Sequence, residues 1–198
     1  AKSFIKSSLD VTIFTTIPVT VGLMALAPEL IDTFAGEAFK PGIATMQIMS
    51  LLPIVIGIGH LLSFQLLIPF GQNKAVFVSM LIGLAVSITA NLVLIPMFLD
   101  KGAAISAVIT ETIVCAAYYY HLTNDNKFKI HYNLLYQTLI SSLVFVPIIM
   151  GVRMAFDNPI VICILSIFTC VLAYSILQFF VFKNVGVFKS IIHKRTQL

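Results

Sequence analysis

The chain of 198 residues is 59% hydrophobic and only 10% charged, with a formal net charge of +4 and a mean hydropathy of +1.03. Ordinary soluble domains carry about 25% charged residues, and a domain of this size cannot hide so much apolar surface from water. This composition excludes a soluble globular domain and predicts an integral membrane protein.

Six apolar segments follow one another, and each is long enough to cross a bilayer core, which takes about 20 helical residues. They cover residues 11–31, 41–69, 74–99, 102–122, 133–156 and 159–182. The stretch "SSLD" (residues 7–10) has the pattern of a capping box before the first segment, and Asn158 precedes Pro159 as an N-cap. The sequence predicts an all-α integral membrane protein, with a six-helix transmembrane bundle over residues 1–182 and a basic tail over 183–198.

Lysine and arginine are distributed unequally between the two sides that this order of spans defines. Of the twelve, only Lys40, Lys101 and Arg153 fall on the side opposite the N-terminus. Because positively charged loops remain in the cytoplasm, we expect both ends of the chain to be cytoplasmic. The basic residues are scattered over loop ends, which argues against a nucleic-acid partner. The basic tail either contacts anionic lipids or frays into solvent.

Cysteine and histidine patterns indicate neither a disulfide framework nor a metal site, and we expect no cofactor. Cys115, Cys163 and Cys170 fall inside predicted spans, where free thiols behave as small apolar groups. The four histidines show no metal-ligand spacing. The sequence also has no serine-nucleophile elbow, His/Asp cluster or Asp-rich metal motif, which argues against a membrane-embedded enzyme.

Glu111 is unusual because it falls near the middle of the fourth predicted span. A charged, unpaired carboxylate at that depth costs at least about 2.5–3.5 kcal/mol. Glu111 is therefore either protonated and hydrogen-bonded to a neighbour such as Asn91, or a cavity group that binds a proton, a cation or a substrate. His60, in the second span, is a second buried titratable candidate for such a site, and a structural, hydrogen-bonded histidine is the alternative.

Arg153 lies near the end of the fifth span, four residues before Asp157. An i, i+4 ion pair with a snorkelling arginine explains this residue without a ligand. A role for Arg153 in substrate binding is the alternative interpretation.

Small residues indicate where helices approach closely. In the fourth span Ala103 and Ala107 belong to a small face that leads to Glu111, and Gly83 belongs to a similar face of the third span. A tight turn, "LDKG", joins the two spans. Because small residues let membrane helices pack closely, we expect these faces to meet in a hairpin.

Prolines inside the spans indicate bends, because each removes a backbone hydrogen bond. Pro18, Pro53 and Pro147 are the candidates, and Pro53 lies close to Gly57. Kinked helices of this kind are typical of transporters and also occur in static bundles.

The stretch "NLVLIPMFLDKGAAISAVITE" (residues 91–111), with "LLIPFGQNKAVFVS" and "IDTFAGEAFKPGIATMQIMSLLPI" before it, resembles the C-terminal half of polysaccharide flippases. These belong to the multidrug/oligosaccharidyl-lipid/polysaccharide exporter superfamily. They typically show Asn, then Pro, then G-x-x-G-A-A and a Glu. The matching positions here are Asn91, Pro96, Gly102, Ala103, Ala104 and Glu111. Leu99 stands where the first glycine of that motif falls.

The resemblance implies one lobe of a twelve- or fourteen-helix, MATE-like transporter, preceded by an N-terminal lobe. It implies that a lipid-linked oligosaccharide is flipped across the bacterial plasma (inner) membrane by alternating access, for cell-surface polysaccharide biosynthesis. In that mechanism Pro18 and Pro53 would be flexing points. A multidrug exporter of the same superfamily is one alternative function. The other is a non-transporting structural or dimeric six-helix bundle, whose small-residue faces would form the dimer seam.

Overall fold

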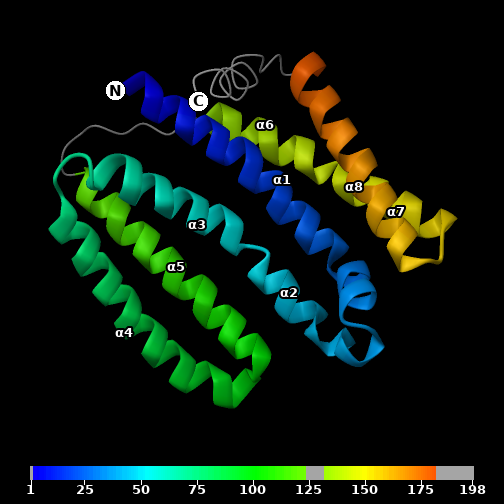
Figure 1. Cartoon of the computed structure of the whole chain (residues 1–198), viewed down its shortest axis with the longest axis horizontal. Coiled ribbons are helices and arrows are strands. Elements are labelled where there is room, and N and C mark those ends of the chain that lie inside the picture. The colour runs from blue at the N-terminus through cyan, green and yellow to red at the C-terminus, as the bar shows by residue number, and fades with distance from the viewer. Residues whose placement is uncertain (1, 124–131, 182–198) are drawn as a thin grey trace.

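The computed structural model describes residues 2–123 and 132–181, and within these ranges every regular element is a helix (Figure 1). The 3-10 helix is η1, and η2 and η3 are π-helices. In chain order the elements are α1 (Lys2–Phe34), η1 (Glu37–Gly42), α2 (Ile43–Met49), α3 (Leu52–His60), η2 (Leu61–Leu67), α4 (Asn73–Phe98), α5 (Asp100–Thr123), α6 (Tyr132–Leu143), α7 (Phe145–Ala155), α8 (Pro159–Ile176) and η3 (Leu177–Val181). The basic tail predicted over 183–198 lies outside the described residues.

Six helical segments are long and apolar enough to cross a membrane, which confirms the prediction of an all-α protein with six candidate spans. They run over Ser7–Phe34, Glu37–Leu67, Asn73–Phe98, Asp100–Leu122, Leu134–Ala155 and Pro159–Phe179. The second span consists of four consecutive elements, η1 to η2, and the fifth consists of α6 and α7. The fold is consistent with a multi-pass membrane protein.

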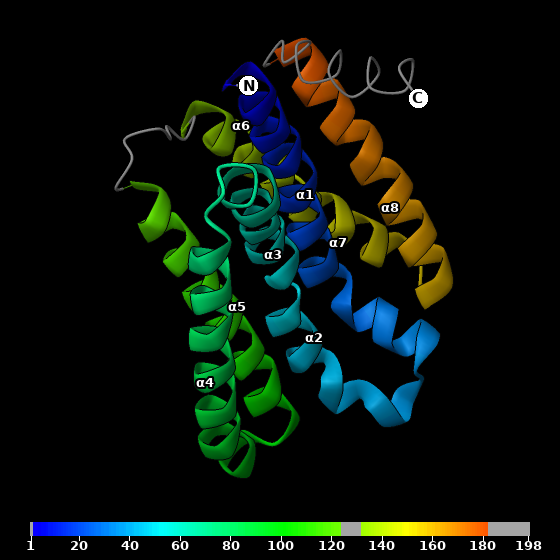
Figure 2. The same ribbon diagram turned by 60° about the vertical axis from the view of Figure 1, so that its left-hand side comes forward.

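Helix α1 is the centre of the bundle and packs against α2, α3, α6, α7 and α8. The α4–α5 hairpin lies on one side of α1, beyond α3, and α8 lies on the other side with α7 (Figures 1 and 2). In Figure 2 the N-terminal end of α1 and the last turns of α8 are at the top, and the α4–α5 turn is at the bottom. Successive spans therefore run in alternating directions through the bundle.

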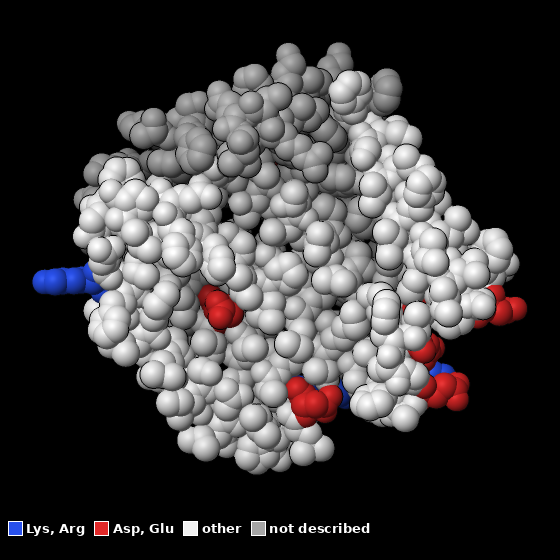
Figure 3. Space-filling view, viewed as in Figure 1, with Lys and Arg blue, Asp and Glu red and all other residues white. Residues whose placement is uncertain are grey.

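Two apolar clusters hold the bundle together, and α1 contributes to both. The first joins α1 to η2, α4 and α5, with Ile13, Leu62 and Tyr118 among its buried members. The second joins α1 to α7 and α8, through residues such as Phe145 and Tyr174. Many other large apolar side chains are exposed, and the described residues on the face shown in Figure 3 carry charged groups at only a few places. A surface of this kind suits contact with lipid.

Prolines coincide with breaks in two of the spans. The second span breaks between α2 and α3, just before Pro53, and the fifth breaks between α6 and α7, just before Pro147. A proline cannot donate a backbone hydrogen bond, so the carbonyls four residues earlier, of Met49 and Leu143, lose their helical partner at these breaks. α1, in contrast, stays one helix through Pro18 and Pro28.

Two predicted helix starts have different outcomes. Asn158 is the N-cap of α8, as predicted, and its Oδ1 accepts a hydrogen bond from the backbone N of Ile160 at 3.0 Å. The predicted cap over residues 7–10 is wrong, because α1 begins at Lys2 and runs through them. Ser8 is buried inside the helix, and its carbonyl accepts a hydrogen bond from the Thr12 hydroxyl at 2.9 Å.

Candidate functional site

Helices α4 and α5 lie very close together because the residues that face each other across their contact are small. A Cβ added to Gly83 of α4 would lie 2.3 Å from Val114 Cγ2 of α5. Ser79 of α4 and Ser106 of α5 are both fully buried. This is the close approach that small residues allow between membrane helices, and it fixes one wall of the candidate site.

The turn between α4 and α5 consists of one residue, Leu99, with φ 53° and ψ −125°. These angles match the first central position of a type II′ turn, which favours glycine. Gly102 follows with no space for a side chain, because an added Cβ would lie 2.1 Å from the carbonyl oxygen of Leu94. The backbone therefore favours glycine at two positions, and Leu99 holds one of them.

The two alanines expected to pack in the hairpin differ in burial. Ala107 is partly buried, whereas Ala103 is exposed, and the buried position at the start of α5 belongs to Ala104. Outside the hairpin, Gly57 of α3 packs against α1, because an added Cβ there would lie 2.8 Å from Thr16 Cγ2.

A cavity of about 480 Å³ lies between α3, η2, α4 and α5. Most of its lining is apolar, so its few polar side chains determine what it can bind. They come from all four elements: His60, Ser63, Ser87, Thr110, Glu111 and Tyr118. The structure therefore brings two of the sequence-predicted site residues, Glu111 and His60, to one cavity from different helices.

Glu111 is the central residue of the span Asp100–Leu122 and lies partly buried in the cavity. Among the side chains that the structure describes, none forms a hydrogen bond or an ion pair with its carboxylate. The neighbouring Thr110 hydroxyl is buried and also has no partner among the described groups. An unpaired charge is unfavourable at this depth, so the arrangement suits uptake of a proton, a cation or a hydrogen-bonding ligand.

His60 is exposed, and the prediction that it is buried is wrong. It is the last residue of α3, directly before the π-helix η2. Its ring meets the Phe64 ring edge to face, with 5.5 Å between the ring centroids. π-helical turns are frequent at functional sites, and here the change of helix type lies directly after His60, whose imidazole lines the cavity.

Asn91 is not the partner of Glu111, and that interpretation is wrong. Its Nδ2 donates to the Ser87 carbonyl oxygen at 2.9 Å and to Ser87 Oγ at 3.3 Å, both within α4. Ser87 lines the cavity, and its Oγ accepts from Asn91, so the Ser87 hydroxyl proton is directed elsewhere. Asn91 therefore acts on the cavity only through Ser87.

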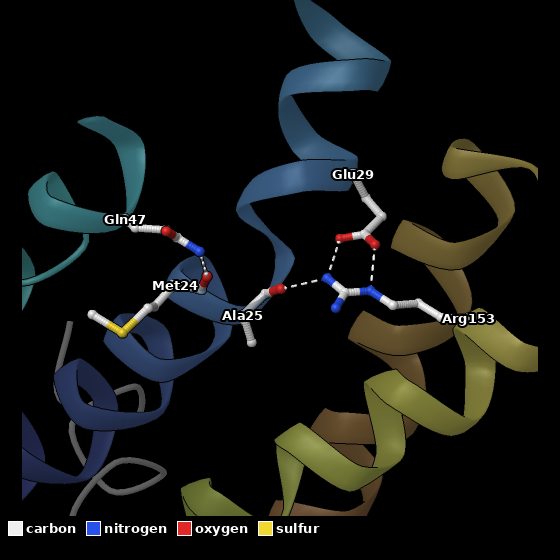
Figure 4. Close-up of polar contacts among 5 residues, drawn as sticks. All are labelled: Met24, Ala25, Glu29, Gln47 and Arg153. Carbon is white, nitrogen blue, oxygen red and sulfur yellow. Dashed lines mark hydrogen bonds and ion pairs between the residues drawn. The ribbon is translucent and has the colours of Figure 1, made fainter. Parts of the chain in front are cut away.

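Arg153 of α7 pairs with Glu29 of α1 (Figure 4). Arg153 Nε lies 2.5 Å from Glu29 Oε1, and Nη2 lies 2.8 Å from Oε2. The same Nη2 donates to the carbonyl oxygen of Ala25 at 2.8 Å. Glu29 is buried, with 7% of its surface exposed. Arg153 lies away from the Glu111 cavity, and its two-point pair joins α7 to α1.

The predicted pair between Arg153 and Asp157 is wrong. Helix α7 ends at Ala155, and Phe156 is extended, with φ −138° and ψ 140°. Asp157 is therefore not one helical turn from Arg153, and the i, i+4 geometry that an ion pair needs is lost.

Two residues in this region of the structure were overlooked in the sequence: Glu29, the partner of Arg153, and Gln47, which contacts the same part of α1. Pro28 cannot donate to the Met24 carbonyl oxygen, which is left without its usual partner inside α1. Gln47 of α2 supplies a donor, because its Nε2 lies 3.5 Å from that oxygen (Figure 4). The available signal was Pro28 beside Glu29, since carbonyls freed inside a membrane helix need donors from neighbouring helices.

No protein-family model matches the chain, and no curated protein matches it. The class of protein follows from the fold alone: an all-helical protein with six candidate spans, consistent with a multi-pass membrane protein. Within the described ranges, no group of three or more His, Cys, Asp or Glu residues could hold a metal ion. The cavity that contains Glu111 and His60 is the candidate functional site.

Proposed function

We propose that this chain is one lobe of a transporter that flips a lipid-linked oligosaccharide, like the polysaccharide flippases that its sequence resembles. The observation that carries the proposal is the cavity between α3, α4 and α5. At the centre of a membrane span it holds Glu111, whose carboxylate has no partner among the described side chains. In membrane proteins, ionisable residues at this depth mostly mark substrate or ion pathways.

The α4–α5 turn supports the resemblance on which the cargo depends. Leu99 adopts a conformation that favours glycine, at the position where those flippases have one. Gly102 meets the Leu94 carbonyl so closely that no other residue fits without a shift. These backbone features are independent of the apolar composition that many membrane helices share.

The elements around the cavity are suited to movement of one lobe against another. The second span is broken before Pro53 and changes to a π-helix after His60. α4 packs mainly on α5 and leaves large apolar side chains such as Leu84 exposed. A second lobe facing this side would cover His60 and close the cavity, which is the arrangement that alternating access requires.

The chemistry of the cavity suits a neutral, hydroxyl-rich cargo. The Ser87 hydroxyl lines the cavity and can hydrogen-bond a sugar, and the Glu111 carboxylate can accept a hydrogen bond. The described lining contains neither Lys nor Arg, so the cations for a diphosphate group would come from the other lobe. Uptake of a proton or cation by Glu111 on one side and its release on the other would couple transport to an ion gradient.

The test uses the native gene product that contains this chain. We expect that deleting the gene removes cell-surface polysaccharide and leaves oligosaccharide lipids on the cytoplasmic leaflet. Complementation with Glu111→Gln should restore less polysaccharide than wild type at equal protein level. Glu37→Gln is the matched control, because Glu37 is an exposed acid of η1 outside the cavity, and it should complement fully.

Two results would contradict the proposal. Normal surface polysaccharide in the deletion strain, together with increased sensitivity to cationic drugs, would favour a multidrug exporter. Equal complementation by Glu111→Gln and Glu37→Gln would show that the cavity carboxylate has no role in transport.

A further inference from the structure

A second cavity, of about 340 Å³, lies between α1, α7 and α8, away from Glu111. Its floor consists of buried apolar side chains, among them Leu26 and Ile149. Its rim is open, because Val19, Ile167 and Val171 are 49%, 50% and 59% exposed. The cavity therefore opens sideways, onto the apolar surface that the six spans turn outwards.

The lining offers a ligand almost no polar group. Tyr174 carries the only hydroxyl among the described lining residues, and this hydroxyl donates to the Phe14 carbonyl oxygen at 2.8 Å. The Cys170 thiol is a weak hydrogen-bonding group. Cavities without polar partners do not hold ordered water, and apolar cavities of about 150 Å³ already take up apolar ligands.

The shape of the cavity follows α1. The lining residues of α1 extend from Pro18 to Leu30, which corresponds to about 18 Å along a helix axis. This is more than half of a hydrocarbon core of about 30 Å. Gly22 leaves a notch in this wall, since an added Cβ would meet no atom within 4 Å. An elongated apolar space along a membrane span fits a hydrocarbon chain better than a compact ligand.

We propose that this cavity binds one acyl chain of a bilayer phospholipid, whose headgroup stays at the membrane surface. The rim is continuous with the lipid-facing surface, and at this depth of a bilayer the surrounding molecules are acyl chains. A chain in the cavity restores the dispersion contacts that the lining would otherwise lack. The bound lipid thereby braces α8 against α1, whatever cargo the other cavity carries.

The experiment uses the full chain in nanodiscs that contain a phospholipid with a diazirine near the end of one acyl chain. After irradiation, mass spectrometry of peptides locates the adducts. We expect them on the α1 and α8 residues of the cavity, in excess over a similarly exposed residue of α8 outside the cavity, Phe168. Gly22→Leu should reduce these adducts about tenfold, because loss of two buried methylene contacts weakens binding by about that factor.

Gly151→Leu is the matched control, because a Cβ added there also meets no atom within 4 Å and Gly151 does not line the cavity. It should leave the adducts unchanged. Labelling that follows exposed area alone, or that Gly22→Leu does not reduce, would overturn the proposal. If Gly22→Leu does not fold, Val171→Phe narrows the rim and should reduce the same adducts. Displacement of the acyl probe by equimolar polyprenyl phosphate would assign the cavity to the cargo's tail and also overturn the proposal.

Discussion

Arg153 and Glu29 join α7 to α1 through a two-point ion pair, with nitrogen–oxygen distances of 2.5 and 2.8 Å. Glu29 directly follows Pro28, where α1 lacks one backbone donor. One guanidinium nitrogen also donates to the Ala25 carbonyl oxygen. Arg153 thus satisfies a buried carboxylate and also stabilises the turn of α1 that the proline weakens.

We expect Arg153→Met to lower the free energy of unfolding by about 2 kcal/mol, because it leaves Glu29 buried without a partner. This expected loss is smaller than for a fully buried ion pair, since the Arg153 side chain is 37% exposed. Arg153→Lys should be less stable than wild type and more stable than Arg153→Met, because lysine keeps the charge but lacks the planar fork of arginine. Thermal unfolding in detergent micelles measures both. Lys40→Met, which breaks surface pairs with Glu37 and Asp32, is the control and should change little. Equal losses in Arg153→Met and Lys40→Met would contradict the stabilising role of the Arg153–Glu29 pair.

Gly102→Ala should destabilise the α4–α5 hairpin by roughly 1–3 kcal/mol or more, the range for forced overpacking. The obstacle is backbone, because the new Cβ would lie 2.1 Å from the Leu94 carbonyl oxygen. Gly42→Ala is the matched control, since a Cβ there meets nothing within 4 Å. Thermal unfolding and expression level check the difference. A Gly102→Ala protein as stable as Gly42→Ala would mean that the turn is wider than described.

Leu99→Gly should stabilise the protein by about 1 kcal/mol. A non-glycine residue at such a positive φ costs about 1–3 kcal/mol, part of which is offset by the greater freedom of glycine in the unfolded chain. As a comparison, Leu92→Gly in the interior of α4 should destabilise by about 1 kcal/mol. Opposite signs of the two shifts in unfolding temperature are expected. Destabilisation by both would contradict the turn geometry.

Glu111 should react with dicyclohexylcarbodiimide, an apolar reagent that reaches carboxyl groups within membranes, because no described side chain pairs with its carboxylate. Glu29 is the internal control, because Arg153 neutralises its carboxylate and occupies both of its oxygens. Peptide mass spectrometry compares the two sites in one sample. Preferential modification of Glu29 would contradict the assignment of Glu111 as the unpaired group.

The apolar spans could be predicted because each is a long, continuous run whose boundaries depend on neighbouring residues. Asn158 is an example of such local information, since its side chain caps the helix that begins at the next residue. The hairpin of α4 and α5 was also predictable, because the chain between them is too short for another arrangement. The exposure of His60 could not be predicted, because it depends on how η2 packs relative to α4 and α5.

The Arg153–Glu29 contact could not be predicted from local spacing. The two residues are 124 positions apart, and Asp157 is a nearer candidate in the sequence. That candidate fails because α7 ends two residues after Arg153. The pairing depends on how α1 packs against α7, which neither segment encodes alone.

The most direct test of the proposed function is flipping by the native gene product in proteoliposomes. A fluorescent lipid-linked oligosaccharide is placed in both leaflets, and a glycosidase added outside reports how fast the inner pool becomes accessible. We expect wild type and Glu37→Gln to expose the inner pool, and Glu111→Gln to do so at least about tenfold more slowly, the effect of losing roughly 1.4 kcal/mol. An inner pool that stays protected with wild type, or equal rates in all three proteins, would contradict the proposed function.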